Sequence, residues 1–75
     1  MSSHYTMVIQ WSEEDQVFVV SFPEFGPYSK THGTSYEAAA RNGQEVLELL
    51  IDAFQADGKP LPDPAKFGST VAIAK

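Results

Sequence analysis

The stretch that decides the fold runs from residue 5 to residue 22 and reads YTMVIQW, SEEDQ, VFVVSF. Apolar and polar residues alternate from Tyr5 to Trp11, the two-residue period of a strand with one buried face. The second run, Val17 to Phe22, is rich in β-branched and aromatic residues, which favour a strand. Because only the short polar segment 12–16 separates the two runs, we predict an antiparallel β-hairpin.

The two faces of the predicted hairpin differ in composition. Side chains that alternate onto the core face are Tyr5, Met7, Ile9, Trp11, Phe18, Val20 and Phe22. The opposite face carries Val8, Val17 and Val19. Exposed apolar rows of this kind usually become interfaces, so we interpret these three valines as candidate self-association residues.

A bend and a third strand follow the hairpin. Residues 23–27, PEFGP, end the second strand because proline lacks the amide donor that a central strand needs. The polar run 28–32, YSKTH, predicts a third strand in an exposed or edge position, ended by Gly33. Residues 34–37, TSYE, match a capping box, which predicts a helix that begins at Thr34 or Ser35.

An amphipathic helix of about six turns continues from this cap. Its apolar stripe comprises Tyr36, Ala40, Gly43, Val46, Leu47, Leu50, Ile51 and Phe54, and its polar side Arg41, Glu45, Glu48 and Asp52. Glycine inside a helix costs roughly 0.8 to 1 kcal/mol relative to alanine. We therefore interpret Gly43 as a point where helix and sheet approach closely, with a kink as the alternative. The pair at 57 and 58, DG, is typical of a helix end, and residues 69–74 predict a last strand.

These elements predict an α+β fold: an antiparallel three- to four-stranded sheet, in the order β-β-β-α-β, packed against one long amphipathic helix. With 75 residues the whole chain, 1–75, is expected to form a single domain. A domain of this size buries only roughly 60 to 65% of its surface. Because the chain has no cysteine for disulfides or thiolate metal sites, self-association remains as a source of stability, and we predict a homodimer or larger symmetric oligomer.

The charge of the chain bears on its partners. Ten acidic residues against five scattered basic ones give a net charge of −5. Because nucleic-acid binding needs several lysine or arginine side chains along the phosphate backbone, we expect no direct binding to nucleic acid. A basic protein partner suits this charge, and a purely solubilising role is the alternative. The sequence has neither a signal-like start nor a membrane-length apolar run, so we expect a cytoplasmic protein without membrane contact.

No residues form a recognisable active site in the sequence. A three-stranded antiparallel start followed by a helix is how ribonuclease-H-like nucleases begin, but their metal chemistry needs a carboxylate on the first strand. Residues 4–12 contain none. The histidines, His4 and His32, have no second ligand at a metal-binding spacing, and no phosphate or dinucleotide motif is present. We therefore expect no catalytic residue, no metal site and no cofactor, which makes an enzyme the third-ranked interpretation.

Several segments together match the pattern of a known family in order and spacing, and they cover most of the chain. They are YTMVIQW at 5–11, ED at 14–15, VFVVSFPEF at 17–25, GTSYEAA at 33–39, Asn42, EVLEL at 45–49 and DGKPLP at 57–62. Through them the sequence resembles the HicB-like antitoxins of bacterial type II toxin–antitoxin systems. The chain departs from the family in the bend, where members typically read Pro-Asp-Leu-Pro-Gly-Cys and residues 23–28 read PEFGPY.

The resemblance implies a partial, degenerate ribonuclease-H-like fold and a non-enzymatic function. Family members bind and neutralise a small basic ribonuclease, the HicA-like toxin, and so stop its cleavage of mRNA. Many carry a further DNA-binding domain, which we do not expect in a chain that ends at Lys75. Because loops carry recognition more often than strands, we select Glu24, Phe25 and Tyr28 in the bend as candidate partner-binding residues. The alternative function is a stand-alone, self-associating structural domain with no cognate toxin.

Overall fold

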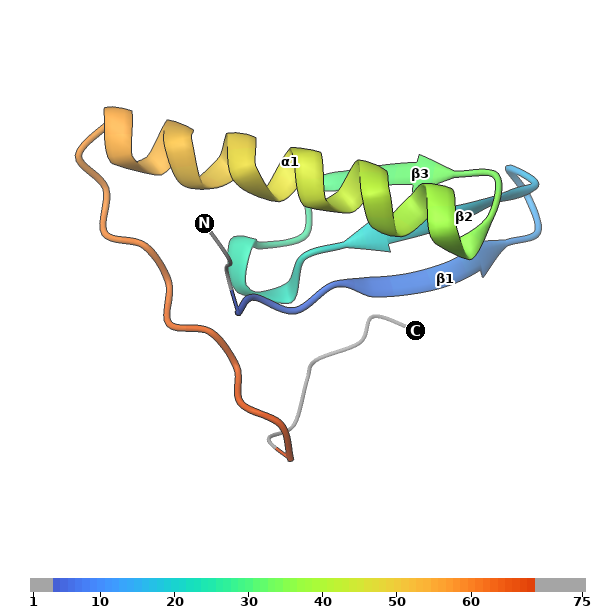
Figure 1. The fold of residues 1–75 in the computed structure, drawn as a ribbon, viewed down its shortest axis with the longest axis horizontal. Helices are drawn as coiled ribbons and strands as arrows, with labels where there is room; N and C mark the ends of the chain where they lie inside the picture. The colour runs from blue at the N-terminus through green and yellow to red at the C-terminus, as the bar shows by residue number, and fades with distance from the viewer. Residues whose placement is uncertain (1–3, 69–75) are drawn as a thin grey trace.

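A computed structural model describes residues 4–68 and shows a three-stranded antiparallel sheet crossed on one face by a long helix (Figure 1). The strands, in the order β1-β2-β3, are β1 (Val8–Ser12), β2 (Val17–Ser21) and β3 (Lys30–Gly33). A short 3₁₀ helix, η1 (Pro23–Phe25), lies between β2 and β3, and the helix α1 (Tyr36–Ala56) follows. The predicted α+β fold is confirmed. The predicted last strand, residues 69–74, lies outside the described residues.

The register of the strands decides which side chains share a face. Ile9 lies opposite Val20 and Trp11 opposite Phe18, so these four side chains are on the face toward α1. Gln10 lies opposite Val19 and Ser12 opposite Val17, which puts both valines on the face away from the helix. The predicted division of the hairpin into a core face and a valine face is confirmed. β3 lies at an edge of the described sheet, as its polar sequence predicted.

Two strands begin later than predicted. β1 begins at Val8 and not at Tyr5, and the amide of Thr6 donates to the Glu24 carboxylate. β3 begins at Lys30 and not at Tyr28, because residues 27 and 28 form a turn after η1. The start of β1 is therefore determined by a hydrogen bond outside the sheet, and the start of β3 by the turn before it. The side-chain pattern of the sequence reveals neither of these.

The two ends of α1 are closed by local hydrogen bonds. The Ser35 hydroxyl accepts a hydrogen bond from the amide of Ala38 at 3.0 Å, so Ser35 is the N-cap. The predicted start of the helix at Thr34 or Ser35 is confirmed at Ser35, but the predicted capping box between Thr34 and Glu37 is wrong. At the other end Gly58 has φ +69°, and the next amide, that of residue 59, donates to the carbonyl of residue 54 at 2.9 Å. This is a Schellman end, as the DG pair predicted.

The core lies between α1 and the sheet. Its fully or nearly fully buried side chains are Val20, Phe22, Ala39, Leu47 and Ile51. On the helix, the buried positions follow steps of four, with Ala39, not the predicted Ala40, at the N-terminal end. A Cβ at Gly43 would lie 2.6 Å from Sδ of Met7 and 3.2 Å from Cγ1 of Val20. The interpretation of Gly43 as a point of close approach is confirmed.

Candidate protein-interaction surfaces

The bend after β2 holds Glu24, one of the predicted partner-binding residues. Its carboxylate accepts hydrogen bonds from the amide of Thr6 at 3.1 Å, from the hydroxyl of Thr6 at 2.9 Å and from the amide of Ala65 at 2.9 Å. Burial by itself raises the pKa of Glu24, but these hydrogen bonds outweigh it, and the pKa lies below its usual 4.5. Glu24 therefore joins the N-terminal segment, η1 and the segment after α1.

The other two predicted partner residues of the bend differ in exposure. The ring of Phe25 contacts Tyr5, with centroids 4.8 Å apart, and Phe54 of α1, with centroids 5.3 Å apart. Tyr28 is 96% exposed. The structure thus brings Glu24 and Phe25 into internal contacts and leaves Tyr28 as the side chain of the three that is free to meet a partner.

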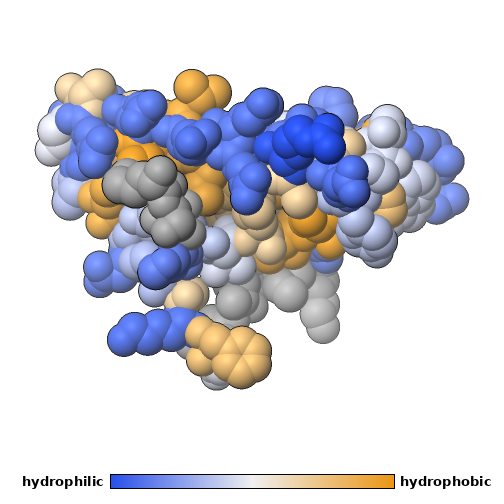
Figure 2. Space-filling model, viewed as in Figure 1, coloured by the Kyte–Doolittle hydropathy of each residue, from blue (hydrophilic) through white to orange (hydrophobic). Residues whose placement is uncertain are grey.

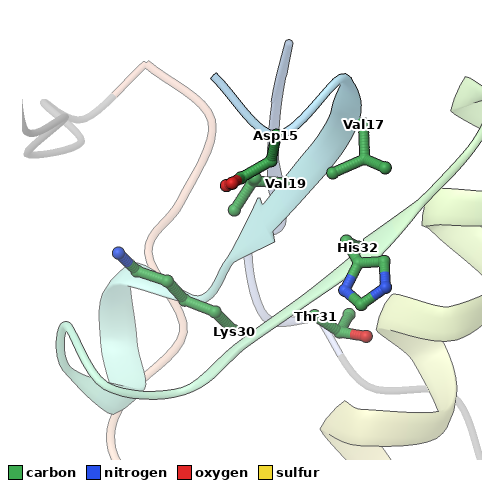
Figure 3. A pocket seen from close by; sticks show the side chains of 6 residues that line it. All are labelled: Asp15, Val17, Val19, Lys30, Thr31 and His32. Atoms are coloured by element: carbon green, nitrogen blue, oxygen red, sulfur yellow. The ribbon is translucent and has the colours of Figure 1, made fainter. Parts of the chain in front are cut away.

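The face of the sheet opposite α1 carries the valines predicted for self-association. Val8, Val17 and Val19 lie there half-buried, on neighbouring strands. An open hollow of about 430 Å³ lies over this face, lined by Asp15, Val17, Val19, Lys30, Thr31 and His32 (Figure 3). The hollow combines two apolar side chains with groups of both charge signs. This arrangement suits contact with another polypeptide, since an apolar centre excludes water and a polar rim sets orientation.

A third surface was not predicted from the sequence. Trp11, Phe18 and Tyr36 form a row of rings, with centroid distances of 5.1 Å and 4.3 Å between neighbours, and we call it the aromatic row. The indole N–H of Trp11 donates to Oε2 of Glu13 at 2.7 Å. Trp11 is 47% exposed and Tyr36 66% exposed, although both were assigned to apolar core positions. The sequence does place several aromatic residues at one end of the hairpin and helix. Their periodicity alone assigns them to the core, so their exposure was not predicted.

Titratable groups do not gather into a metal site in the part of the chain that the structure describes: no three histidine, aspartate or glutamate side chains there come together. His32 is on β3 at the edge of the hollow, whereas His4 lies in the segment before β1. Among the described helices, none has the length and apolar character needed to span a membrane.

Comparison of the chain with family models, with curated proteins and with solved structures finds no match. The three surfaces described above, namely the bend, the valine face and the aromatic row, are therefore interpreted from their own chemistry.

Proposed function

We propose that this chain is a non-enzymatic, HicB-like antitoxin module that binds and neutralises a small basic ribonuclease. The observation that supports the proposal is the β1-β2-β3-α1 order, because a three-stranded antiparallel sheet followed by a helix is the start of the ribonuclease-H-like fold that the resemblance implies. The segment VFVVSFPEF forms β2 and η1, GTSYEAA begins at the end of β3 and runs into α1, and DGKPLP follows the end of α1. The segments that carry the resemblance thus lie in the sheet, the helix and the segment after it.

The charge distribution supports a basic protein partner. The chain carries a net charge of −5. Acidic side chains are exposed in the turn between β1 and β2, at Glu13, Glu14 and Asp15, and on the outer face of α1, at Glu45 and Glu48. A ribonuclease must itself present positive charge to hold the phosphates of RNA. Opposite charge on the two proteins accelerates their encounter, and bound antitoxin then competes with RNA for the basic surface.

A reconstituted cleavage assay tests this function. A purified small basic ribonuclease of the HicA-like type is the candidate toxin, and the substrate is a labelled mRNA. We expect cleavage to fall in proportion to added chain and to stop near a fixed stoichiometric ratio, because a tight inhibitor titrates its target. Cleavage that continues undiminished in excess of the chain contradicts the proposal. Bovine serum albumin at the same concentration controls for nonspecific protection of RNA.

The second candidate function is a self-associating structural domain, which the valine face favours. If Val8, Val17 and Val19 meet the same row on a second copy, the purified chain has a dimeric or larger mass by light scattering. Val19→Lys is then expected to reduce that mass to the monomer, because it buries a charge in an apolar contact. Leu49→Lys, at an exposed position on α1, is the matched control and leaves the mass unchanged. A strictly monomeric wild-type chain at high concentration removes this candidate.

A further inference from the structure

The aromatic row lies at the end of the molecule where the β1–β2 turn and the start of α1 meet. Trp11 comes from β1, Phe18 from β2 and Tyr36 from the first turn of α1, so the row crosses three elements. α1 packs chiefly on β3 and β2 and touches β1 little. Among the described residues α1 therefore covers little of β1, and Figure 2 shows hydrophobic surface beside the hydrophilic outer side of the helix. An aromatic surface of this kind is open to a partner.

The row adjoins negative charge. Oε2 of Glu13 accepts the hydrogen bond from the Trp11 indole, which holds the carboxylate beside the ring. A carboxylate accepts about four hydrogen bonds, so Oε1 of Glu13 remains a free acceptor. Glu37 follows Tyr36 in the first turn of α1 and forms an exposed ion pair with Arg41 at 3.4 Å. The exposed ring of Trp11 therefore lies beside a carboxylate that its own indole N–H holds in place.

We propose that the aromatic row binds an arginine side chain of a basic protein partner, with the guanidinium stacked on the exposed rings of Trp11 and Tyr36 and one N–H donated to Glu13. Guanidinium is planar and weakly hydrated, so it stacks on aromatic faces and donates to a carboxylate at the same time. A lysine ammonium makes a point contact and loses more hydration. The proposal rests on the proposed function for the partner's identity, a basic toxin, and its chemistry is tested separately from that function.

Trp11 is the sole tryptophan of the chain, so its fluorescence reports directly on the row. The probes are three capped peptides of five residues, alternating glycine with arginine, with lysine or with glutamine, titrated into the full chain. We expect the arginine peptide to change the Trp11 emission to saturation, with an affinity that falls as salt rises. The lysine peptide is expected to bind at least threefold more weakly, and the glutamine peptide to cause no change. Equal responses to the arginine and glutamine peptides overturn the proposal.

Variants then locate the binding. Glu13→Gln keeps an acceptor for the indole but removes the charge, and Tyr36→Leu keeps an apolar group but removes the ring. Each is expected to weaken binding of the arginine peptide about tenfold, while circular dichroism reports an unchanged fold. Glu48→Gln is the matched control, because it removes the same charge on α1 at about 18 Å along the helix axis from Tyr36. If Glu13→Gln and Glu48→Gln weaken binding equally, the effect is one of net charge, and the proposed site is wrong.

The cleavage assay separates this proposal from the proposed function. Inhibition by the wild type that Tyr36→Leu weakens supports both. Inhibition that Tyr36→Leu leaves unchanged overturns the aromatic row as the docking site and leaves the antitoxin function standing. In a third outcome, the chain binds the arginine peptide specifically but does not inhibit the ribonuclease. That result supports the proposed site and contradicts the toxin as its partner.

Discussion

At the scale of single residues, Glu24 connects the most distant parts of the chain. Its carboxylate accepts hydrogen bonds from Thr6, 18 residues before it, and from Ala65, 41 residues after it. Glu24 was a predicted partner-binding residue because it lies in a loop, where recognition is common. In the structure, the Glu24 carboxylate instead accepts hydrogen bonds from the backbone amides of Thr6 and Ala65.

Replacing Glu24 tests this role through its dependence on pH. Because the folded-state pKa of Glu24 lies below its usual 4.5, the stability it contributes is fully present above that value and is lost as pH falls through the folded pKa. Glu24→Gln is expected to cost about 1 to 2 kcal/mol at pH 7, since hydrogen bonds to a charged group are lost. Urea denaturation from pH 7 to pH 3 measures the difference, which should shrink toward the acid end. Glu45→Gln, at an exposed helix position, should show no such convergence.

Two buried glycines allow a second test at the residue scale. Gly43→Ala gains helix propensity of about 1 kcal/mol but places a methyl group against Met7 and Val20, and we expect a net loss of about 1 kcal/mol. A methyl group at Gly33 would collide with the backbone of Ala38 and Ala39, which cannot move aside as a methionine side chain can. Gly33→Ala should therefore cost about 3 kcal/mol. Thermal denaturation gives both values, and a more stable Gly43→Ala protein contradicts the close approach.

At the scale of elements, the start of α1 has a single cap. The Ser35 hydroxyl satisfies the amide of Ala38, and Thr34 is exposed and makes no side-chain bond to the helix. Ser35→Ala is expected to lower the free energy of unfolding by about 1 kcal/mol, the usual worth of an N-cap. Thr34→Ala is the neighbouring control and should change it little. Chemical denaturation of the two variants distinguishes the positions, and equal losses would mean that the cap is shared.

The same element scale explains how much of the fold was predictable. The hairpin, the third strand and the helix were all predicted, because each has a periodicity or turn chemistry that acts over a few residues. The boundaries were less predictable. On α1 the pattern assigned Ala40 to the core, whereas Ala39 is buried against Gly33, because the direction from which the sheet meets the helix selects the face. Asn42 adds a further tertiary contact, since its amide donates to the carbonyl of His32 at 2.8 Å and occupies an acceptor at the sheet edge.

At the scale of the whole molecule, the segment after α1 turns back toward the start of the chain (Figure 1). The hydroxyl of Tyr5 donates to the carbonyl of Pro62 at 2.7 Å, and Leu61 packs against the core. A helix and three short strands leave the end of the core near η1 open, so this returning segment adds cover there. Among the described residues, side-chain hydrogen bonds and packing attach this segment to the fold, and it does not pair with a strand of the sheet.

Removing one hydroxyl tests this attachment. Tyr5→Phe keeps the ring contact with Phe25 and removes the hydrogen bond to Pro62, so we expect a loss of about 1 kcal/mol. Limited proteolysis with trypsin should then cut faster after Lys66, which is exposed, whereas the Lys59–Pro60 bond resists trypsin. Tyr28→Phe removes a hydroxyl that is almost fully exposed, and it should change neither stability nor cleavage rate. Equal cleavage rates for the two variants contradict the attachment.

The candidate surfaces were likewise predictable only where local backbone geometry decides them. Strand alternation predicted that Val8, Val17 and Val19 share a face, because that relation depends only on local backbone geometry. Strand alternation also assigned Trp11 to the core face, and helix periodicity assigned Tyr36 to the apolar stripe. Both side chains are instead exposed, because among the described elements α1 packs mainly on β2 and β3 and covers little of β1.

The sequence by itself determined the kind and order of the elements, the two faces of the hairpin and the acidic character of the molecule. Backbone sterics and side-chain periodicity act within a few residues, and charge follows from composition. All three can therefore be predicted from the sequence alone. Only the tertiary structure decided the exposure of the aromatic row and the internal role of Glu24. Both depend on how elements far apart in the chain are placed against one another, and that placement is determined by packing of the whole core.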